Sequence, residues 1–379
     1  MRKMTSPDRM KLINERNILK VVHENPGIYR KLIAQKTGLS SQTVTNLVAE
    51  LVERRVLLEY SPSLGVKGRN PVSLAVNYAG FYMITADINI EKVAVYVNSL
   101  DEAVVAFAEQ PVDQTVDVLA VLKELIGRVL DQAGTGKRIT ASVLSVTGVV
   151  NEDKGIVVEA GKLNWYNLDL AGELAYLGVP VLVRNDVNMV AYYEKAKYPA
   201  DLNFMIAKID VGIGSAFVLG GRVLESTNNV AGELGHVTVA APGKERPCVC
   251  GKSNCLTKFI SLEALELDYG KSYAQLVEDV GKKDPRAVAL IEDICTYLAP
   301  VLANTIILLD LDRIILCGCT VDHFRSIIYP CLDRKIRKLL SYWVSFKRLE
   351  IHSNIYIAQI GTQFLLDYIF AGEQDFILL

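Results

Sequence analysis

The sequence predicts an α/β protein in which a small, mainly helical head precedes a larger body of two lobes. Helical apolar spacing fills residues 10–53, and apolar strands alternate with amphipathic helices from Phe81 onward. The charge is also distributed unevenly between head and body: residues 1–70 carry 13 Lys and Arg against 6 Asp and Glu, whereas the remainder carries 28 Lys and Arg against 37 Asp and Glu. A basic head on an acidic body indicates that only the head meets a polyanion.

The composition favours a cytoplasmic protein without a membrane partner. The 379 residues suffice for two or three domains, and half of them are hydrophobic. The first 16 residues are charged throughout and lack the apolar core of a signal peptide, and the best apolar run, Thr305–Cys319, contains three charges. The seven cysteines are an odd number, and four of them lie in apolar surroundings, which indicates a reducing compartment: Cys295, Cys317, Cys319 and Cys331.

The head contains three segments with helical spacing. They are expected at Met10–His23, Tyr29–Lys36 and Ser41–Glu53. Gly38 supplies a tight turn before the third helix, and Ser40 is its expected N-cap. Val44, Leu47, Val48 and Leu51 share one face of that helix, so the opposite face is polar.

Two strands with a Gly- and Ser-rich loop between them follow, at Val56–Tyr60 and Val72–Val76, as in a wing. Residues 1–78 are therefore expected to form a winged helix-turn-helix that binds operator DNA. The alternative is a helical module that binds another protein. Arg54 and Arg55 are expected to contact the DNA backbone. The other expected DNA contacts are Ser41, Gln42, Thr43, Thr45 and Asn46 on the third helix, with Lys67 and Arg69 in the wing.

The body, residues 79–379, is expected to comprise two α/β lobes. The first spans about 79–195 with a C-terminal helix added, and the second spans about 196–360. One long strand is expected at residues 203–219, and helices at 116–133 and 170–177. Several strands end in Asp, Asn or Gly, which is where α/β folds place ligand sites.

Three cysteines within eight residues predict a metal site. Cys248, Cys250 and Cys255, with His236 as the fourth ligand, suit a closed tetrahedral Zn²⁺ site of structural type. Gly251 would let the loop fold back on itself. The alternative is a cluster of free thiols beside a surface histidine.

A second polar group combines Asn185, Asp186 and Asn188 at a strand end with Glu233 near His236. Their carboxylates and amides could hold the hydroxyls of a polyhydroxylated ligand. Alternatively, Asn185 and Asp186 could simply cap a helix that starts at Val187.

The chain resembles the ROK family (repressors, open reading frames and sugar kinases) over essentially its whole length. The resemblance rests on LSSQTVTNLVAELVERRVLLE, GRNPVSLAVN, RNDVNMVA, VAGELGHVTV and CVCGKSNCL, and the head places the chain among the xylose-repressor-like members. It implies an actin-like, hexokinase-type body that binds a sugar through Asn185, Asp186, Glu233 and His236. His236 would then bind zinc through one ring nitrogen and face the sugar with the other.

Departures from the family pattern argue against kinase activity. The first phosphate loop has become Asp87-Ile88-Asn89-Ile90-Glu91, and Val211 replaces the Thr before Gly212-Ile213-Gly214. The adenosine loop has become Leu316-Cys317-Gly318-Cys319, and Thr257 replaces a Glu that the family uses near the sugar. Asp186 holds the position of the catalytic base. We expect no phosphoryl transfer and interpret Gly212–Gly214 as a former phosphate loop kept for its bend.

Together these features predict a sugar-responsive transcriptional repressor of carbohydrate-metabolism genes. Its partners would be operator DNA and a sugar effector such as xylose or another aldose, and it would act as a homodimer or homotetramer. Two alternatives are a sugar kinase with a fused DNA-binding head and a repressor controlled by a partner protein alone.

Overall fold

The computed structural model describes residues 6–61, 72–353 and 357–371 of the chain. The chain forms two compact units: Met1–Arg184 with Ile357–Leu379, and Asn185–Tyr356. The second unit begins at Asn185 and not at 196, because helix α6 (Asp186–Lys195) packs against strands β11 and β12 of that unit. The helix that we expected in the first lobe therefore belongs to the second unit.

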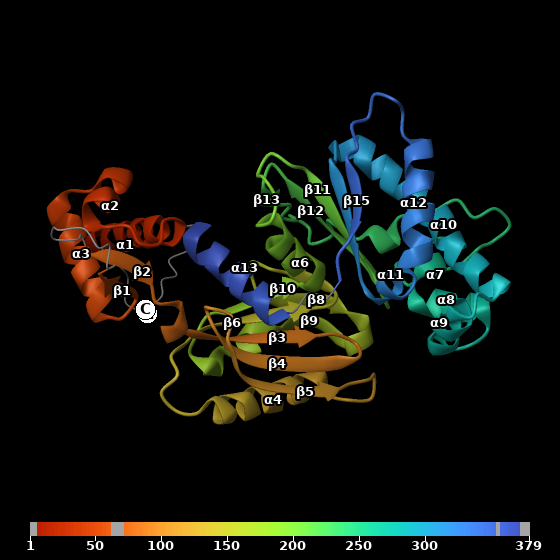
Figure 1. Ribbon diagram of the computed structural model, residues 1–379. Helices are drawn as coiled ribbons and strands as arrows, with labels where there is room; N and C mark the ends of the chain where they lie inside the picture. Colours follow the sequence, from red (N-terminus) through yellow and green to blue (C-terminus); the bar gives the residue numbers. More distant parts are fainter. Residues whose placement is uncertain (1–5, 62–71, 354–356, 372–379) are drawn as a thin grey trace. The chain divides into compact units, whose positions relative to one another are not determined.

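The head comprises helices α1 (Ser6–Glu24), α2 (Arg30–Thr37) and α3 (Ser41–Glu53), followed by strands β1 (Leu57–Tyr60) and β2 (Ser73–Val76), as Figure 1 shows. The two strands pair antiparallel with Leu57 opposite Val76. Gly38 ends α2 in the left-handed conformation, and the Ser40 hydroxyl accepts the Thr43 N–H at the start of α3. Both features confirm the turn and the cap that the sequence predicted.

The first lobe is built on a five-stranded sheet in the order β10-β6-β3-β4-β5. Its strands are β3 (Tyr82–Ile88), β4 (Lys92–Ser99), β5 (Val104–Pro111), β6 (Ile139–Val146) and β10 (Val181–Asn185). Helix α4 (Val118–Ala133) packs on β4 and β5, while α13 (Ile357–Ala371) packs on β3 and β6 (Figure 1). A small sheet of β7 (Val149–Asn151), β8 (Ile156–Ala160) and β9 (Trp165–Asp169), the helix α5 (Leu170–Glu173) and the 3-10 turn Ala175–Leu177 complete it.

The second unit contains a sheet in the order β13-β12-β11-β14-β15. Its strands are β11 (Phe204–Ile209), β12 (Ile213–Leu219), β13 (Arg222–Val223), β14 (Arg313–Cys317) and β15 (Arg348–Ile351). Both sheets follow one pattern. The strand that comes first in the chain, β3 or β11, is the central strand; two antiparallel strands follow on one side of it, and a parallel strand, β6 or β14, pairs with its other side. The two lobes are thus structural repeats, which their sequences alone were too divergent to establish.

One predicted strand was wrong. Residues 203–219 form the antiparallel hairpin of β11 and β12, because Asp210 N–H donates to the Gly212 carbonyl and reverses the chain. Neither Gly212 nor Gly214 has positive φ, so the chain turns here without the left-handed conformation. Gly214 is needed for another reason: a Cβ there would lie 2.9 Å from the Val187 side chain of α6.

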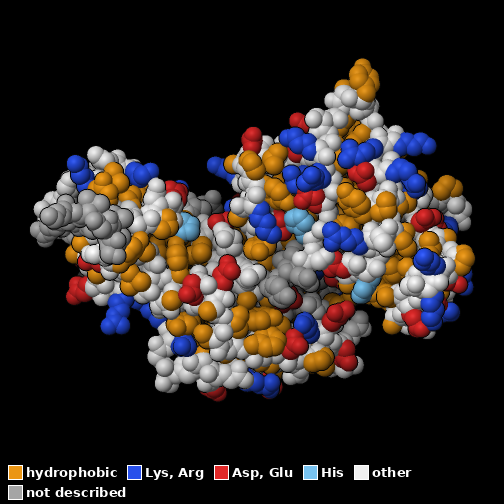
Figure 2. All heavy atoms as spheres, in the orientation of Figure 1, with side chains coloured by type: hydrophobic (Ala, Val, Ile, Leu, Met, Phe, Trp, Pro, Cys, Tyr) orange, Lys and Arg blue, Asp and Glu red, His pale blue; other side chains and the backbone are white. Residues whose placement is uncertain are grey.

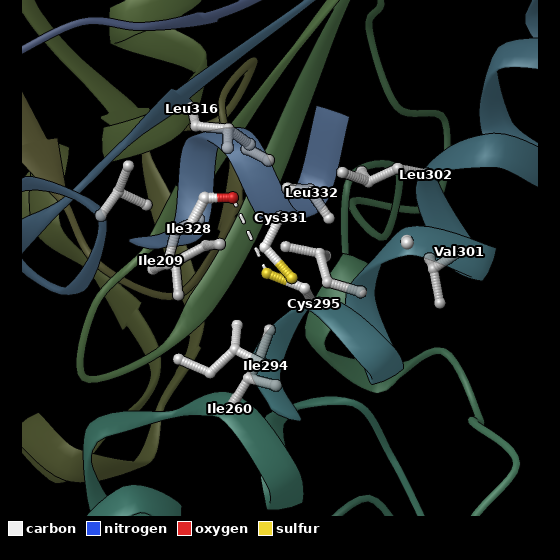
Figure 3. Close-up of a cluster of buried hydrophobic side chains, with 14 of the residues drawn as sticks. Ile209, Ile260, Ile294, Cys295, Val301, Leu302, Leu316, Ile328, Cys331 and Leu332 are labelled. Atoms are coloured by element: carbon white, nitrogen blue, oxygen red, sulfur yellow. Dashed lines mark hydrogen bonds between the residues drawn. The ribbon is translucent and has the colours of Figure 1, made fainter. Parts of the chain in front are cut away.

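Helices α7 (Thr257–Ile260), α8 (Leu262–Tyr269), α9 (Tyr273–Gly281), α10 (Pro285–Leu309), α11 (Cys319–His323) and α12 (Arg325–Leu339) complete the second unit. In its core the side chains of Cys295 on α10 and Cys331 on α12 point toward one another among Ile and Leu side chains (Figure 3). All seven cysteines are free thiols, and Cys295, Cys317 and Cys331 are buried. These three therefore act as small apolar side chains.

The apolar run Thr305–Cys319 covers the end of α10 and the strand β14. Within the described ranges, α10 is long and apolar enough to span a membrane by length and composition alone, but its inward face packs in the core of the second unit. An apolar tip stands at the top of Figure 2, at the α12–β15 loop, where Tyr342 and Trp343 are largely exposed.

Candidate functional site

The third helix of the head presents the polar face that the sequence predicted. Val44, Leu47, Val48 and Leu51 are buried, whereas Ser41, Gln42, Thr45 and Asn46 are exposed and Thr43 is half-buried. The Gln42 side-chain amide donates to Asn46 Oδ1 over 2.9 Å, which leaves the Gln42 carbonyl and the Asn46 amide for other partners. Such paired amides suit the edge of an adenine in a major groove.

Of the four basic residues expected at the DNA backbone, Lys67 and Arg69 lie outside the described residues. Arg54 has a partner within the head. Its guanidinium lies 3.1 Å from the carboxylate of Glu15, whose side chain is only 4% exposed. Arg54 therefore joins α3 to α1 within the head, since an unpaired Glu15 would be costly to bury.

The four predicted metal ligands lie together. One donor atom from each of His236, Cys248, Cys250 and Cys255 lies within 4.8 Å of the other three. Cys248 Sγ is 3.5 Å from His236 Nδ1, and Cys250 Sγ is 3.5 Å from Cys255 Sγ. A tetrahedral zinc ion with bonds of about 2.3 Å would hold two sulfurs about 3.8 Å apart, so the donor set fits the ion.

The loop that carries these cysteines is shaped by its backbone. Gly251 has φ +85°, and its N–H donates to the carbonyl of Cys248, which folds the loop back as expected. Burial and the neighbouring thiols raise the pKa of Cys255 to about 12. The Cys255 thiol therefore remains protonated by itself, and a bound cation would be needed to ionise it.

Two glycines position Glu233 and His236: Glu233 lies between Gly232 and Gly235, and His236 directly follows Gly235. Gly232 has φ +94°, and a Cβ there would lie 2.0 Å from the Ser215 carbonyl oxygen. A Cβ on Gly235 would lie 2.7 Å from the Ile213 carbonyl oxygen and 3.4 Å from the Thr257 side chain. The Gly-Glu-Leu-Gly-His segment thus lies directly on β12, and Thr257 is adjacent to it. The segment tolerates no side chain at either glycine.

Asn185 and Asp186 occupy the junction of β10 and α6. The Asn185 side chain accepts the Val187 and Asn188 N–H groups, so the capping interpretation is correct for Asn185. Asp186 Oδ1 accepts the Val187 N–H over 3.0 Å, and Oδ2 accepts from Lys208 Nζ over 2.7 Å. Asp186 therefore presents a carboxylate fixed by two donors, at a helix N terminus that favours negative charge.

The side chain of Asp210 forms hydrogen bonds within and beyond the loop after β11. Asp210 Oδ1 accepts the Val211 N–H over 3.0 Å and the Cys319 thiol over 2.7 Å. Burial and the Asp210 carboxylate raise the pKa of Cys319 to about 12, so the thiol stays protonated and donates. Asp210 thus joins the loop after β11 to Cys319 at the start of α11, the two segments interpreted as the former phosphate and adenosine loops. Its carboxylate lies where a phosphate would otherwise approach the backbone.

A similar arrangement closes the loop after β3. Asn89 Oδ1 accepts the N–H groups of Glu91 and Lys92, over 2.9 and 3.0 Å. In both loops a side chain thus accepts backbone N–H groups of its own loop. The sequence revealed the missing glycines, but not these internal acceptors.

With this geometry established, the chain can be compared with known proteins. The ROK family profile matches residues 83–358, and a winged helix-turn-helix DNA-binding profile matches residues 12–57. The chain belongs to the ROK family. Its head is a winged helix-turn-helix and its body has the hexokinase-like fold of that family, as predicted.

Several ROK relatives are regulators. The xylose repressor of Bacillus spizizenii is 25% identical over 371 residues, which cover 94% of this chain and 91% of that protein. The xylose repressor of Caldicellulosiruptor bescii is 27% identical over 277 residues, covering 71% and 69%. The Escherichia coli dual regulator NagC is 23% identical over 349 residues, covering 86% and 85%.

Solved ROK structures agree with this fold. A ROK family transcriptional regulator, a homologue of the Escherichia coli MLC protein, superposes with a TM-score of 0.81 at 26% identity and covers 96% of this chain and 98% of its own. The ROK hexokinase of Thermus thermophilus superposes with a TM-score of 0.62 at 23% identity, covering 78% and 100%, and therefore supports the fold alone.

Proposed function

We propose that this ROK protein is a sugar-responsive, DNA-binding transcriptional repressor of carbohydrate-metabolism genes, whose kinase-like body senses a sugar without phosphorylating it. The observation that carries the proposal is the union of a winged helix-turn-helix with a body in which Asn89 accepts the Glu91 and Lys92 N–H groups and Asp210 accepts the Val211 N–H. Phosphoryl transfer depends on positioning and electrostatic support of the phosphates, which these loops do not offer.

In this proposal residues 1–78 are the DNA-binding domain and residues 79–379 the sugar-binding body. The base-reading face comprises Ser41, Gln42, Thr43, Thr45 and Asn46, while Lys67 and Arg69 contact phosphates. Operators with two-fold symmetry require paired heads, so the protein acts as a homodimer or homotetramer. Its place is the cytoplasm, where the operator lies.

The sugar ligands in this proposal are Asn185, Asp186, Glu233 and His236, and the sugar is xylose or another aldose. A structural Zn²⁺ bound by His236, Cys248, Cys250 and Cys255 holds the loop that carries His236. Since His236 Nδ1 faces Cys248, its Nε2 is the atom assigned to the sugar. The sugar must bind two states of the chain with different affinity in order to change operator binding.

An operator gel shift with a panel of aldoses, amino sugars and sugar phosphates tests the proposal. We expect at least one sugar to change operator affinity about tenfold, which corresponds to a coupling of about 1.4 kcal/mol. If no sugar alters DNA binding, the sensor function is wrong, and control by a partner protein becomes the better explanation. Calorimetry with the same sugars on the full chain would then show no heat.

The kinase alternative is favoured by one observation, the carboxylate of Asp186 at the position of the catalytic base. A glucokinase of Halalkalibacterium halodurans is also 29% identical over 198 residues. Coupled assays of ADP release with the same sugars separate the two functions. We expect no turnover; turnover that Asp186→Asn abolishes would establish the kinase instead.

A further inference from the structure

Lys208 occupies a position for which the proposed function gives no role. Its Nζ lies 2.7 Å from Asp186 Oδ2 and 3.9 Å from Asp210 Oδ2. The three side chains are 27%, 11% and 29% exposed for Lys208, Asp186 and Asp210, so the group is partly shielded from water. One cation thus lies between two carboxylates, one at the start of α6 and one in the loop after β11.

The surrounding strands fix this lysine. Lys208 is on β11, where it pairs with Gly214 of β12 on one side and with Cys317 of β14 on the other. Gly214 also gives the space in which Val187 of α6 packs. The same glycine therefore positions both the lysine and the helix whose first residue is Asp186. The contact between them follows from the packing of the second unit and is not an exposed ion pair.

We propose that Lys208 is a positioning and specificity-determining residue of the sugar site, which holds Asp186 as a fixed acceptor and selects an uncharged sugar over a sugar phosphate. This inference rests on the proposed function. Each carboxylate oxygen can accept two hydrogen bonds, so Asp186 keeps acceptor capacity for sugar hydroxyls after binding Val187 N–H and Lys208 Nζ. Because the carboxylate is already ordered, a sugar does not have to immobilise it on binding.

The selectivity follows from the local charge. Two carboxylates face one ammonium group, and Asp210 also accepts from the thiol of Cys319. The group therefore carries an excess of negative charge in a partly shielded place. A phosphate monoester with a charge of roughly −2 is repelled there, whereas a neutral aldose meets only hydrogen-bond acceptors.

Calorimetry on the full chain with matched pairs, such as glucose and glucose 6-phosphate, tests both parts of the inference. The wild-type protein should bind a neutral aldose at least about tenfold more tightly than its phosphate. Lys208→Met should weaken binding of the neutral aldose by about tenfold or more, because a charge-assisted hydrogen bond is lost. Lys208→Arg, which keeps the charge, should recover most of that loss.

A matched control is Lys282→Met, which breaks the exposed ion pair of Lys282 with Glu278 and should leave sugar affinity unchanged. Thermal unfolding establishes that each variant is folded. If Lys208→Met fails to fold, Asp210→Asn still tests the selectivity, since removing one carboxylate should narrow the preference for the neutral sugar. Sugar binding that neither Lys208→Met nor Asp210→Asn alters overturns this inference alone, whereas a wild-type chain that binds no sugar overturns the proposed function as well.

Discussion

At the scale of the residue, Asn185 and Asp186 show how neighbouring side chains can serve both the folding of a helix and a ligand site. Asn185 caps α6 by accepting two N–H groups, and Asp186 is held by Val187 N–H and by Lys208. The sequence left capping and ligand binding as alternatives for this pair. The structure shows that the cap is real for Asn185, and a cap does not exclude a ligand because carbonyl and carboxylate oxygens have further lone pairs.

Asn46 allows a prediction at this scale. Asn46→Ala should lower operator affinity by about 1–3 kcal/mol, because a base-edge hydrogen bond is lost, while the salt dependence of binding stays unchanged. Fluorescence anisotropy at several salt concentrations measures both quantities. Gln132→Ala, an exposed amide on α4, is the matched control. Equal operator affinity in wild type and Asn46→Ala would show that Asn46 contacts no base edge.

At the scale of the element, the loop of residues 236–257 has little regular structure of its own. It is held by the antiparallel bridges of Thr238 with Cys255 and of Pro247 with Ser253, and by Lys252 Nζ, which donates to the His236 carbonyl over 2.7 Å. Besides Cys248 and Cys255, only Val239 and Leu256 are buried among its apolar side chains, so a metal ion is the obvious source of further stability.

Zinc removal tests this element. We expect one zinc ion per chain by metal analysis, and Cys250→Ser should lose the ion and broaden the unfolding transition. The loop should become the first segment to exchange its amide hydrogens, since few other contacts hold it. Cys319→Ser, which changes a thiol that is not a ligand, should keep one ion per chain. Undamaged protein without metal would refute the zinc site.

At the scale of the whole molecule, α13 connects the first lobe to the head. The Thr362 hydroxyl accepts the side-chain amide of Asn98 on β4 over 2.8 Å, which fixes the helix to the sheet. Near its other end, Phe370 stacks on the ring of His23 with centroids 4.4 Å apart, and His23 Nδ1 pairs with the Tyr78 hydroxyl. The head therefore contacts α13 within the first unit.

His23 makes this contact sensitive to pH. Burial lowers the pKa of His23, although Glu24 and Asp367 oppose the shift, and burial raises the pKa of Tyr78 to about 12, so the phenol donates to a neutral imidazole. A lowered pKa means that the contact is stable above the unfolded value of about 6.5 and is lost as the pH falls through the folded value.

Hydrogen-exchange protection of residues 18–24 and 363–371, relative to the intrinsic exchange rate at each pH, should therefore decrease as the pH falls below about 6.5. His23→Phe, which preserves stacking but cannot titrate, should remove that pH dependence, whereas His323→Phe in the second unit should keep it. An equal loss of protection in wild type and His23→Phe would show that another group controls the contact.

The sequence by itself determined the features that depend on local chemistry. The spacing of Val44, Leu47, Val48 and Leu51 fixed the buried face of α3, and Ser40 and Gly38 fixed its start and the preceding turn. The cysteine spacing likewise indicated a metal site whose four donors the structure brings together. These predictions succeed because capping, helical periodicity and short ligand loops involve residues that are close along the chain.

Only the tertiary structure decided the contacts between distant residues. Lys208 and Asp186 are 22 positions apart, and Asp210 and Cys319 are 109 apart, so no local pattern could reveal either pair. The same reason applies to Arg54, whose ion pair with Glu15 the sequence could not reveal because the two residues are 39 positions apart. The sequence could identify the carboxylates and the missing glycines, but the packing of β11, β12 and α6 determined which charges meet.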